Sequence, residues 1–214
     1  MPRKIFLNPL VSTFLLTILL ISGCKPSLIA ENPVPDVVLT TYETSSFVIQ
    51  IPENYIGAEP NSPGVNAIVS WMTNNGYDAQ GFVNFVQANA TDILFTAIDT
   101  ELSLSGSLSY LTLAGGERPE GFSVDEYMNN YSKIAPEEIF LGREQKDLGE
   151  KSVDVLLYEF SNGGTTFRNS FYFIEIEGDN QLWKFEFVSP KTEYDEKIED
   201  FEKIVAEFKP KPGE

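Results

Sequence analysis

The sequence predicts an α+β domain built around an antiparallel sheet, and two patterns carry this prediction. Over the last third of the chain, apolar and polar residues alternate in three segments separated by Gly-containing turn signals, which is typical of consecutive antiparallel strands. After the third segment, apolar residues recur every three or four positions, at Tyr194, Ile198, Phe201, Val205 and Phe208. This spacing places them along one face of a helix, which we expect to pack against the sheet.

The elements at the start of the domain are expected to be one strand and then two helices. Phe47–Ile51 is a short apolar run that ends at Pro52, as a strand does. Residues 61–74 then show helical spacing and end at an Asn-Asn-Gly turn signal. Residues 79–89 predict a second helix, although Gly81 and the β-branched residues there also suit a strand.

The middle of the chain is expected to contain two strands and a helix. Asp92–Asp99 is a compact apolar run fit for a buried strand, and Leu104–Leu113 alternates well enough to form the next one. A helix is expected to begin at Ser123. Ser123 and Glu126 match a capping box, in which the two side chains bind backbone N–H groups that the helix leaves free.

Three further strands are expected over Ser152–Phe160, Thr165–Glu177 and Gln181–Val188. Asn162-Gly163-Gly164 and Gly178-Asp179-Asn180 supply the turns between them. In the third strand, aromatic residues alternate with Lys184 and Glu186. Such alternation leads us to expect that one face of the sheet is covered and the other contacts solvent.

The N-terminal residues resemble a bacterial lipoprotein signal. Arg3 and Lys4 precede an apolar stretch from Ile5 to Ile21, and the small residues Ser22-Gly23 stand before Cys24, the only cysteine. The stretch is shorter than a membrane span of roughly 20 apolar residues, which argues against an uncleaved helix. An ordinary secretory signal is the other alternative, and the cysteine at this position favours the lipoprotein type.

This resemblance implies that residues 1–23 are removed and that Cys24 carries the lipid. Acyl chains on Cys24, palmitate among them, would then bind the protein to the extracytoplasmic face of a cell membrane or outer membrane. Residues 24–45 contain three prolines and little periodicity, which is typical of a flexible tether. The folded domain is expected over 46–212.

The chain is strongly acidic, with a formal net charge of −17. Removal of residues 1–23 takes away two basic residues and no acid, which leaves a charge of −19. Such a surface repels phosphate backbones, so nucleic acid is not expected as a partner. The acidity is explained first by solubility, and next by a basic protein partner or by cations.

The composition argues against most enzyme chemistry. The chain has no histidine, and an acylated Cys24 offers no thiol, so zinc sites and cysteine nucleophiles are not expected. No serine elbow or phosphate-binding loop is present, and Gly115-Gly116 and Gly163-Gly164 fall where turns are expected. We therefore expect no catalytic residue, no cofactor and no metal site, and a protein that is not an enzyme.

Acidic pairs and aromatic strand residues remain as weaker candidates. The acidic pairs are Glu137-Glu138, Glu175 with Glu177, and Glu199-Asp200, and Asn74–Asp78 is the nearest oxygen-rich turn. Among so many acids such neighbours arise by chance, and we interpret them as solvated. The aromatic set is interpreted as core rather than as a ligand platform: Tyr158, Phe160, Phe167, Phe171, Tyr172, Phe173, Trp183, Phe185 and Phe187.

The order of these elements resembles the PsbP/DcrB-like fold, which includes PsbP of photosystem II and the Ran-binding Mog-type proteins. The resemblance rests on Ile51–Tyr55 after the first strand, on Ser123–Tyr127 at a helix start, and on Phe201–Phe208 at the end of the closing helix. It covers about Phe47 to Phe208 and implies an α/β/α sandwich with a central antiparallel sheet. The two helices after the first strand depart from the family pattern, and histidines of the family's ion sites have no counterpart here.

Members of this family typically act as non-catalytic binding or assembly proteins. Together with the lipid signal, the resemblance implies a membrane-anchored extracytoplasmic lipoprotein that binds or helps assemble another envelope or membrane protein. The alternative is a lipoprotein that binds a small molecule or cation for a transporter. A deep pocket with aromatic walls and converging carboxylates would favour the alternative.

Overall fold

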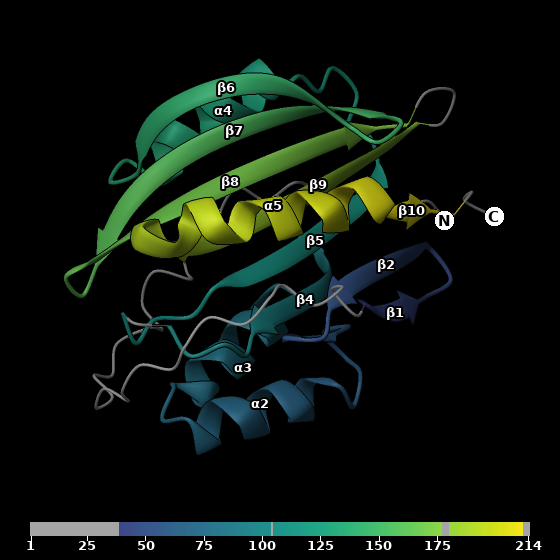
Figure 1. Cartoon of the computed structure of the whole chain (residues 1–214). Helices are drawn as coiled ribbons and strands as arrows, with labels where there is room; N and C mark the ends of the chain where they lie inside the picture. The colour runs from purple at the N-terminus through teal and green to yellow at the C-terminus, as the bar shows by residue number, and fades with distance from the viewer. Residues whose placement is uncertain (1–38, 104, 177–179, 212–214) are drawn as a thin grey trace.

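The computed structural model describes residues 39–103, 105–176 and 180–211. Its main sheet contains seven antiparallel strands, β3 (Tyr55–Ala58), β4 (Ile93–Asp99), β5 (Tyr110–Glu117), β6 (Ile139–Leu148), β7 (Lys151–Asn162), β8 (Thr165–Glu175) and β9 (Gln181–Pro190). Their order across the sheet is β3-β4-β5-β9-β8-β7-β6 (Figure 1). A second sheet contains β1 (Leu39–Glu43), β2 (Phe47–Pro52) and β10 (Lys209–Pro210), with β2 in the middle.

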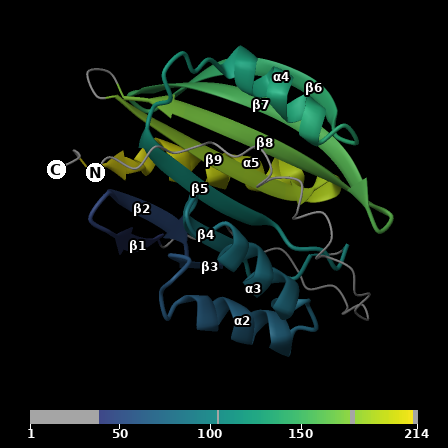
Figure 2. The same ribbon diagram turned by 180° about the vertical axis from the view of Figure 1, so that it is seen from behind.

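Helices cover both faces of the main sheet. The closing helix α5 (Lys191–Glu207) crosses one face, where the small sheet also packs (Figure 1). On the other face lie α4 (Val124–Ile134), over β7 and β8, and the pair α2 (Val65–Asn74) and α3 (Ala79–Ala88), beside β3 and β4 (Figure 2). The expected α/β/α sandwich with an antiparallel sheet is therefore confirmed, as is the pair of helices before β4.

The closing helix packs on the sheet through aromatic side chains, as its spacing predicts. The Phe201 ring stacks on Phe187 of β9, with ring centroids 4.6 Å apart. Phe208, directly after the helix, meets the rings of Trp183 and Phe185 edge-on, at 5.0 Å in both cases. Phe47 of β2 contacts the same Trp183 ring at 6.0 Å, so these contacts join the small sheet, the helix and the main sheet in one core.

The folded region begins earlier than the sequence indicates. Residues 39–43 were expected to belong to the flexible tether, but they form β1 and pair along the whole of their length with β2. The Thr44 hydroxyl accepts hydrogen bonds from the backbone N–H groups of Ser46 and Phe47, both at 3.1 Å, and so closes the turn between the two strands. The signal, Cys24 and the rest of the tether lie outside the described residues.

Strand boundaries differ from the sequence expectations in three places. Neither β3 nor β6 was expected. Strand β3 is very short, and β6 is mostly exposed and shows no regular alternation of apolar and polar residues. Next, β5 begins at Tyr110 and continues through Gly115-Gly116, which were expected to form a turn. The turn at Gly163-Gly164 is confirmed, since φ is 57° and 86° at these two glycines, a region that other residues rarely adopt.

The second face of the sheet is not exposed to solvent, and this expectation was wrong. Lys184 and Glu186 of β9 are both buried. This face is covered by α4, whose Tyr127 ring lies 5.5 Å from Lys184 Nζ, and by the α2–α3 pair. The helix interpretation of residues 79–89 is confirmed, with Asp78 capping α3 by accepting a hydrogen bond from Gly81 N at 3.0 Å. Within the described ranges, no helix combines the length and the apolar character that crossing a bilayer requires.

Gly115 provides a test of how closely this core is packed. A Cβ atom at Gly115 would lie 2.1 Å from Cε3 of Trp183, so Gly115→Ala must displace the indole ring. We expect this overpacking to lower the free energy of unfolding by about 1–3 kcal/mol, measured by urea denaturation. The matched control is Gly142→Ala, since nothing lies within 4 Å of a Cβ atom there. Equal stabilities of the two variants would contradict the packing described.

Candidate functional site

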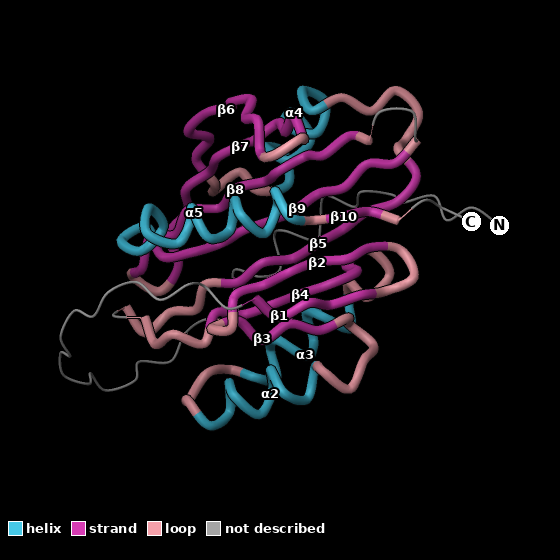
Figure 3. Tube along the Cα trace, turned by 45° about the vertical axis from the view of Figure 1, so that its right-hand side comes forward, coloured by secondary structure: helices cyan, strands magenta, loops and turns pink. Residues whose placement is uncertain are grey.

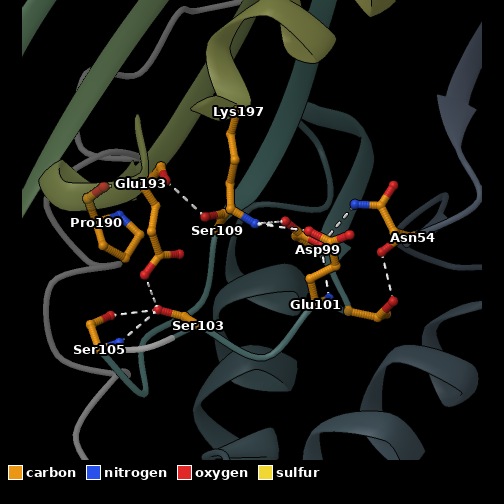
Figure 4. Close-up of polar contacts among 11 residues, drawn as sticks. Asn54, Asp99, Glu101, Ser103, Ser105, Ser109, Pro190, Glu193 and Lys197 are labelled. Carbon is orange, nitrogen blue, oxygen red and sulfur yellow. Dashed lines mark hydrogen bonds and ion pairs between the residues drawn. The ribbon is translucent and has the colours of Figure 1, made fainter. Parts of the chain in front are cut away.

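A cluster of charged residues joins the loop after β4 to the helix α5 (Figure 4). Asp99, only 1% exposed, forms an ion pair with Lys197 of α5. The same carboxylate accepts hydrogen bonds from Asn54 Nδ2, at 3.1 Å, and from the backbone N–H of Glu101, at 2.9 Å. Asp99 thus receives donors from three segments of the chain, which makes it a structural cross-link between them.

A second contact fastens the same loop to the first turn of α5. The Ser103 hydroxyl donates to the Glu193 carboxylate, and the Ser105 hydroxyl lies 2.6 Å from that of Ser103. A carboxylate in the first turn of a helix is also favoured by the helix dipole. Nearby, burial raises the pKa of the Tyr55 hydroxyl well above its usual value, with a further contribution from the Asp99 charge. These groups hold the loop in place and leave Tyr55 neutral.

A buried polar network lies under α4, on the second face of the sheet. The Tyr131 hydroxyl donates to Oε1 of Glu138 at 2.8 Å and accepts from Asn169 Nδ2 at 3.3 Å. The same Asn169 nitrogen lies 3.2 Å from Oε1 of Glu186. The network therefore links α4, the loop that follows it, and the strands β8 and β9.

Glu138 is the carboxylic acid of this network that burial affects most clearly. It is 8% exposed, and Oε2 has no hydrogen-bond partner among the described residues. Burial raises the pKa of Glu138 from 4.5 to about 8, and the Tyr131 hydrogen bond opposes this only in part. Lys184 lies on the same face, where burial lowers its pKa and the rings of Tyr127 and Phe171 lie 5.5 and 5.2 Å from its Nζ.

The structure separates the acidic pairs that the sequence singled out. Only Glu138 of the first pair is buried, whereas Glu137 is exposed. Glu175 pairs with Arg118 at 2.7 Å, and Glu177 lies outside the described residues. Asp200 pairs with Lys203 at 2.7 Å. Across the described part of the chain, no group of three or more acids, cysteines or histidines is arranged to hold a metal ion.

The aromatic set belongs to the core, as interpreted from the sequence. All of its members are buried, and they are distributed among three clusters, one under α5, one beside α2 and α3, and one under α4. A small hollow on the surface is lined by Ala114, Gly116, Glu117, Pro119, Leu182 and Lys184. It has neither the aromatic walls nor the converging carboxylates that a small-molecule or cation carrier would require.

An exposed apolar patch stands out against these satisfied clusters. It consists of Ile139, Phe140 and Leu141 at the start of β6, which are 63%, 42% and 45% exposed. Strand β6 lies at the edge of the sheet, with β7 as its neighbour (Figure 3). We call these three residues the β6 apolar patch. The signal in the sequence that could have identified it is a run of three large apolar residues, separated by Gly142 alone from a charged segment.

Glu138 makes the stability of the protein depend on pH. Because its pKa is higher in the folded than in the unfolded chain, stability is retained below about pH 4.5 and decreases as the pH rises towards 8. The loss is roughly 1.4 kcal/mol for each unit of pKa difference. Urea denaturation between pH 5 and 8 should show this slope, and Glu138→Gln should flatten it. The exposed neighbour supplies the control, since Glu137→Gln should keep the slope; a slope unchanged by Glu138→Gln would contradict the assignment.

No protein-family model matches the chain, and no curated protein matches it. Solved structures are similar to it at low sequence identity. The solution structure of cyanobacterial PsbP (CyanoP) from Synechocystis sp. PCC 6803 has a TM-score of 0.50 at 12% identity, and the match covers 86% of this chain and 99% of that one. LpqN, described as involved in cell envelope biogenesis of Mycobacterium tuberculosis, has a TM-score of 0.47 at 10% identity, with 83% and 93% covered.

The Ran-binding protein Mog1p of Saccharomyces cerevisiae is similar at a TM-score of 0.46 and 9% identity, with 81% of this chain and 95% of that chain covered. At these identities the comparison concerns the fold and not the activity. The resemblance to PsbP-like proteins noted in the sequence is therefore confirmed for the architecture by the match to cyanobacterial PsbP. This chain has the mixed α+β fold, with a central antiparallel sheet, that cyanobacterial PsbP also has.

Proposed function

We propose that this protein is a lipid-anchored, non-catalytic protein on the extracytoplasmic face of a bacterial membrane, where it binds another protein of the envelope. The observation that carries the binding role is the exposure of the β6 apolar patch. Ile139, Phe140 and Leu141 follow one another at an open sheet edge. Taking a large apolar side chain from full exposure to full burial gains roughly 1.5–3 kcal/mol, and a partner that covered these half-exposed side chains would gain the remaining part of it.

The remaining polar clusters support a binding role over a catalytic one. Asp99, Glu193 and Glu138 each accept hydrogen bonds from within the chain, and these bonds fasten loops to helices or strands. The acidic surface adds a condition on the partner. Complementary charge favours a protein that presents an apolar contact surrounded by basic residues.

The anchoring part of the proposal rests on Cys24 and the signal that precedes it. In Cys24→Ser the atom that would receive lipid is lost, so the protein should leave the membrane fraction. The intact protein should take up a clickable palmitate analogue in growing cells, and the variant should not. An unmodified thiol at Cys24 on a freely soluble chain, found by mass spectrometry, would overturn the anchor.

The binding part can be tested by photo-crosslinking in intact cells. A benzoyl-phenylalanine at position 140 should form one discrete adduct on illumination, because Phe140 would contact the partner directly. Position 102 is the matched control, since Leu102 is also apolar and 56% exposed but lies in the loop after β4. Addition of Ile139→Asp and Leu141→Asp should abolish the adduct at position 140. Identical adduct patterns at positions 140 and 102 would contradict the proposed surface.

A further inference from the structure

The charges of Arg143–Asp147 in β6 are complementary to those of a second copy of the same segment that runs antiparallel to it. Arg143 and Glu144 precede Gln145, and Lys146 and Asp147 follow it. When two such segments run antiparallel with Gln145 opposite Gln145, Arg143 faces Asp147 and Glu144 faces Lys146. Each charge therefore lies opposite its counter-charge, which stabilises a cross-strand pair.

The regular part of β6 is also centred on Gln145. Its pairing with β7 is regular from Gly142 to Leu148. On one side of this stretch, Leu141 interrupts the register as a bulge, and on the other side Gly149 turns the chain with a φ of 63°. Gln145 lies at the middle of the regular stretch, so a second β6 strand centred on Gln145 meets a strand without a bulge from Gly142 to Leu148.

The outer edge of this strand is available for pairing. Gln145 and Asp147 are exposed, and within the described residues β6 is hydrogen-bonded to β7 on one side only. A strand at the edge of a sheet presents a row of N–H and C=O groups that another strand can pair with. The opposite edge is formed by the four residues of β3, which is much shorter.

We propose that two copies of this protein pair through β6, antiparallel and centred on Gln145, so that one continuous sheet extends through both. An antiparallel pair of identical strands has two-fold symmetry, which is the commonest symmetry of homodimers. We call the paired stretch Gly142–Leu148 of the two copies the seam. The proposal goes beyond the binding role of the β6 apolar patch, because Ile139, Phe140 and Leu141 of each copy lie outside the seam, at one of its two ends.

The side chains of the seam divide between the two faces of the sheet. Arg143 donates to Asp125 of α4 at 2.6 Å and to Asp154 of β7 at 2.8 and 3.0 Å, so it projects to the α4 face. Lys146 lies 2.6 Å from Glu202 of α5, on the other face, and 3.0 Å from Glu144 of its own strand. An Arg143–Asp147 contact would therefore form on the α4 face and a Glu144–Lys146 contact on the α5 face, each twice because of the symmetry. Asp125 and Asp154 take three of the five N–H donors of the Arg143 guanidinium, which leaves two for a carboxylate of the second copy.

The charges select the register, and the backbone hydrogen bonds supply most of the attraction. Exposed ion pairs contribute little affinity. However, a pairing centred on Arg143, Glu144, Lys146 or Asp147 places that residue opposite its own copy, and like charges directly opposite each other are destabilising. Among these five centres, only Gln145 avoids such a clash. Charges on edge strands commonly prevent unwanted pairing with other strands. Here they would disfavour the other four registers and permit the one centred on Gln145.

The oligomeric state of the full chain in detergent, measured by sedimentation equilibrium, tests the pairing. Asp147→Arg places two positive charges opposite each other and should raise the dimer dissociation constant by at least about tenfold. Glu53→Arg is the matched control, because it makes the same change of charge at an exposed position in the turn between β2 and β3. A wild-type chain that stays monomeric, or a dimer that Asp147→Arg does not weaken, would overturn the proposal.

The register centred on Gln145 is tested separately with variants that each introduce one cysteine into β6. Gln145→Cys places two thiols opposite each other at the symmetry axis, so oxidation should join two chains. Glu144→Cys should form this disulfide at least about tenfold more slowly, because residues two positions out of register have Cβ atoms too far apart for the bond. Equal rates for the two variants would overturn the register. The wild-type chain, whose only cysteine is Cys24, is the blank, and oxidation should leave its chains unjoined.

Discussion

The structure depends on one constraint, which is that the strand β9 is covered on both of its faces. Every residue from Leu182 to Pro190 is buried. Trp183, Phe185 and Phe187 pack under α5, and the residues between them must therefore be buried on the opposite face. Burying charged groups is costly unless they are paired or hydrogen-bonded. The polar network below α4 and the aromatic rings around Lys184 meet this requirement.

The elements that could be predicted from the sequence are those with a strong local signal. The closing helix shows its apolar spacing, α4 its capping box, and the β7–β8 hairpin its pair of glycines. The strands β1 and β6 have no such signal, because their side chains are mostly exposed and only their backbones pair. The alternation of aromatic and charged residues in β9 indicates that the sheet has two different faces. It does not reveal that helices distant in the sequence cover the face with the charged residues.

The chemistry of the acids was predictable only in part. Interpreting most of them as solvated holds for Glu137 and Glu199, which are exposed. It fails for Glu138, because burial of a carboxylate depends on what the tertiary fold places over it and not on its neighbours in sequence. The Asp99–Lys197 contact joins groups that are far apart along the chain, so no spacing could have indicated it. In this protein the acids that matter to the fold are those that fasten one element to another.

The strand β1 also limits how far the domain could lie from a membrane that held the lipid proposed for Cys24. A fully extended chain covers at most 3.3–3.6 Å per residue, so the segment from Cys24 to Leu39 can reach roughly 50 Å. Had the fold begun at Ser46, the limit would be roughly 75 Å. Because the residues of β1 pair with β2, the maximum length of the segment between Cys24 and the folded domain is shorter by about a third. With the lipid proposed for Cys24 in a bilayer, Leu39 could therefore lie at most roughly 50 Å from the membrane surface.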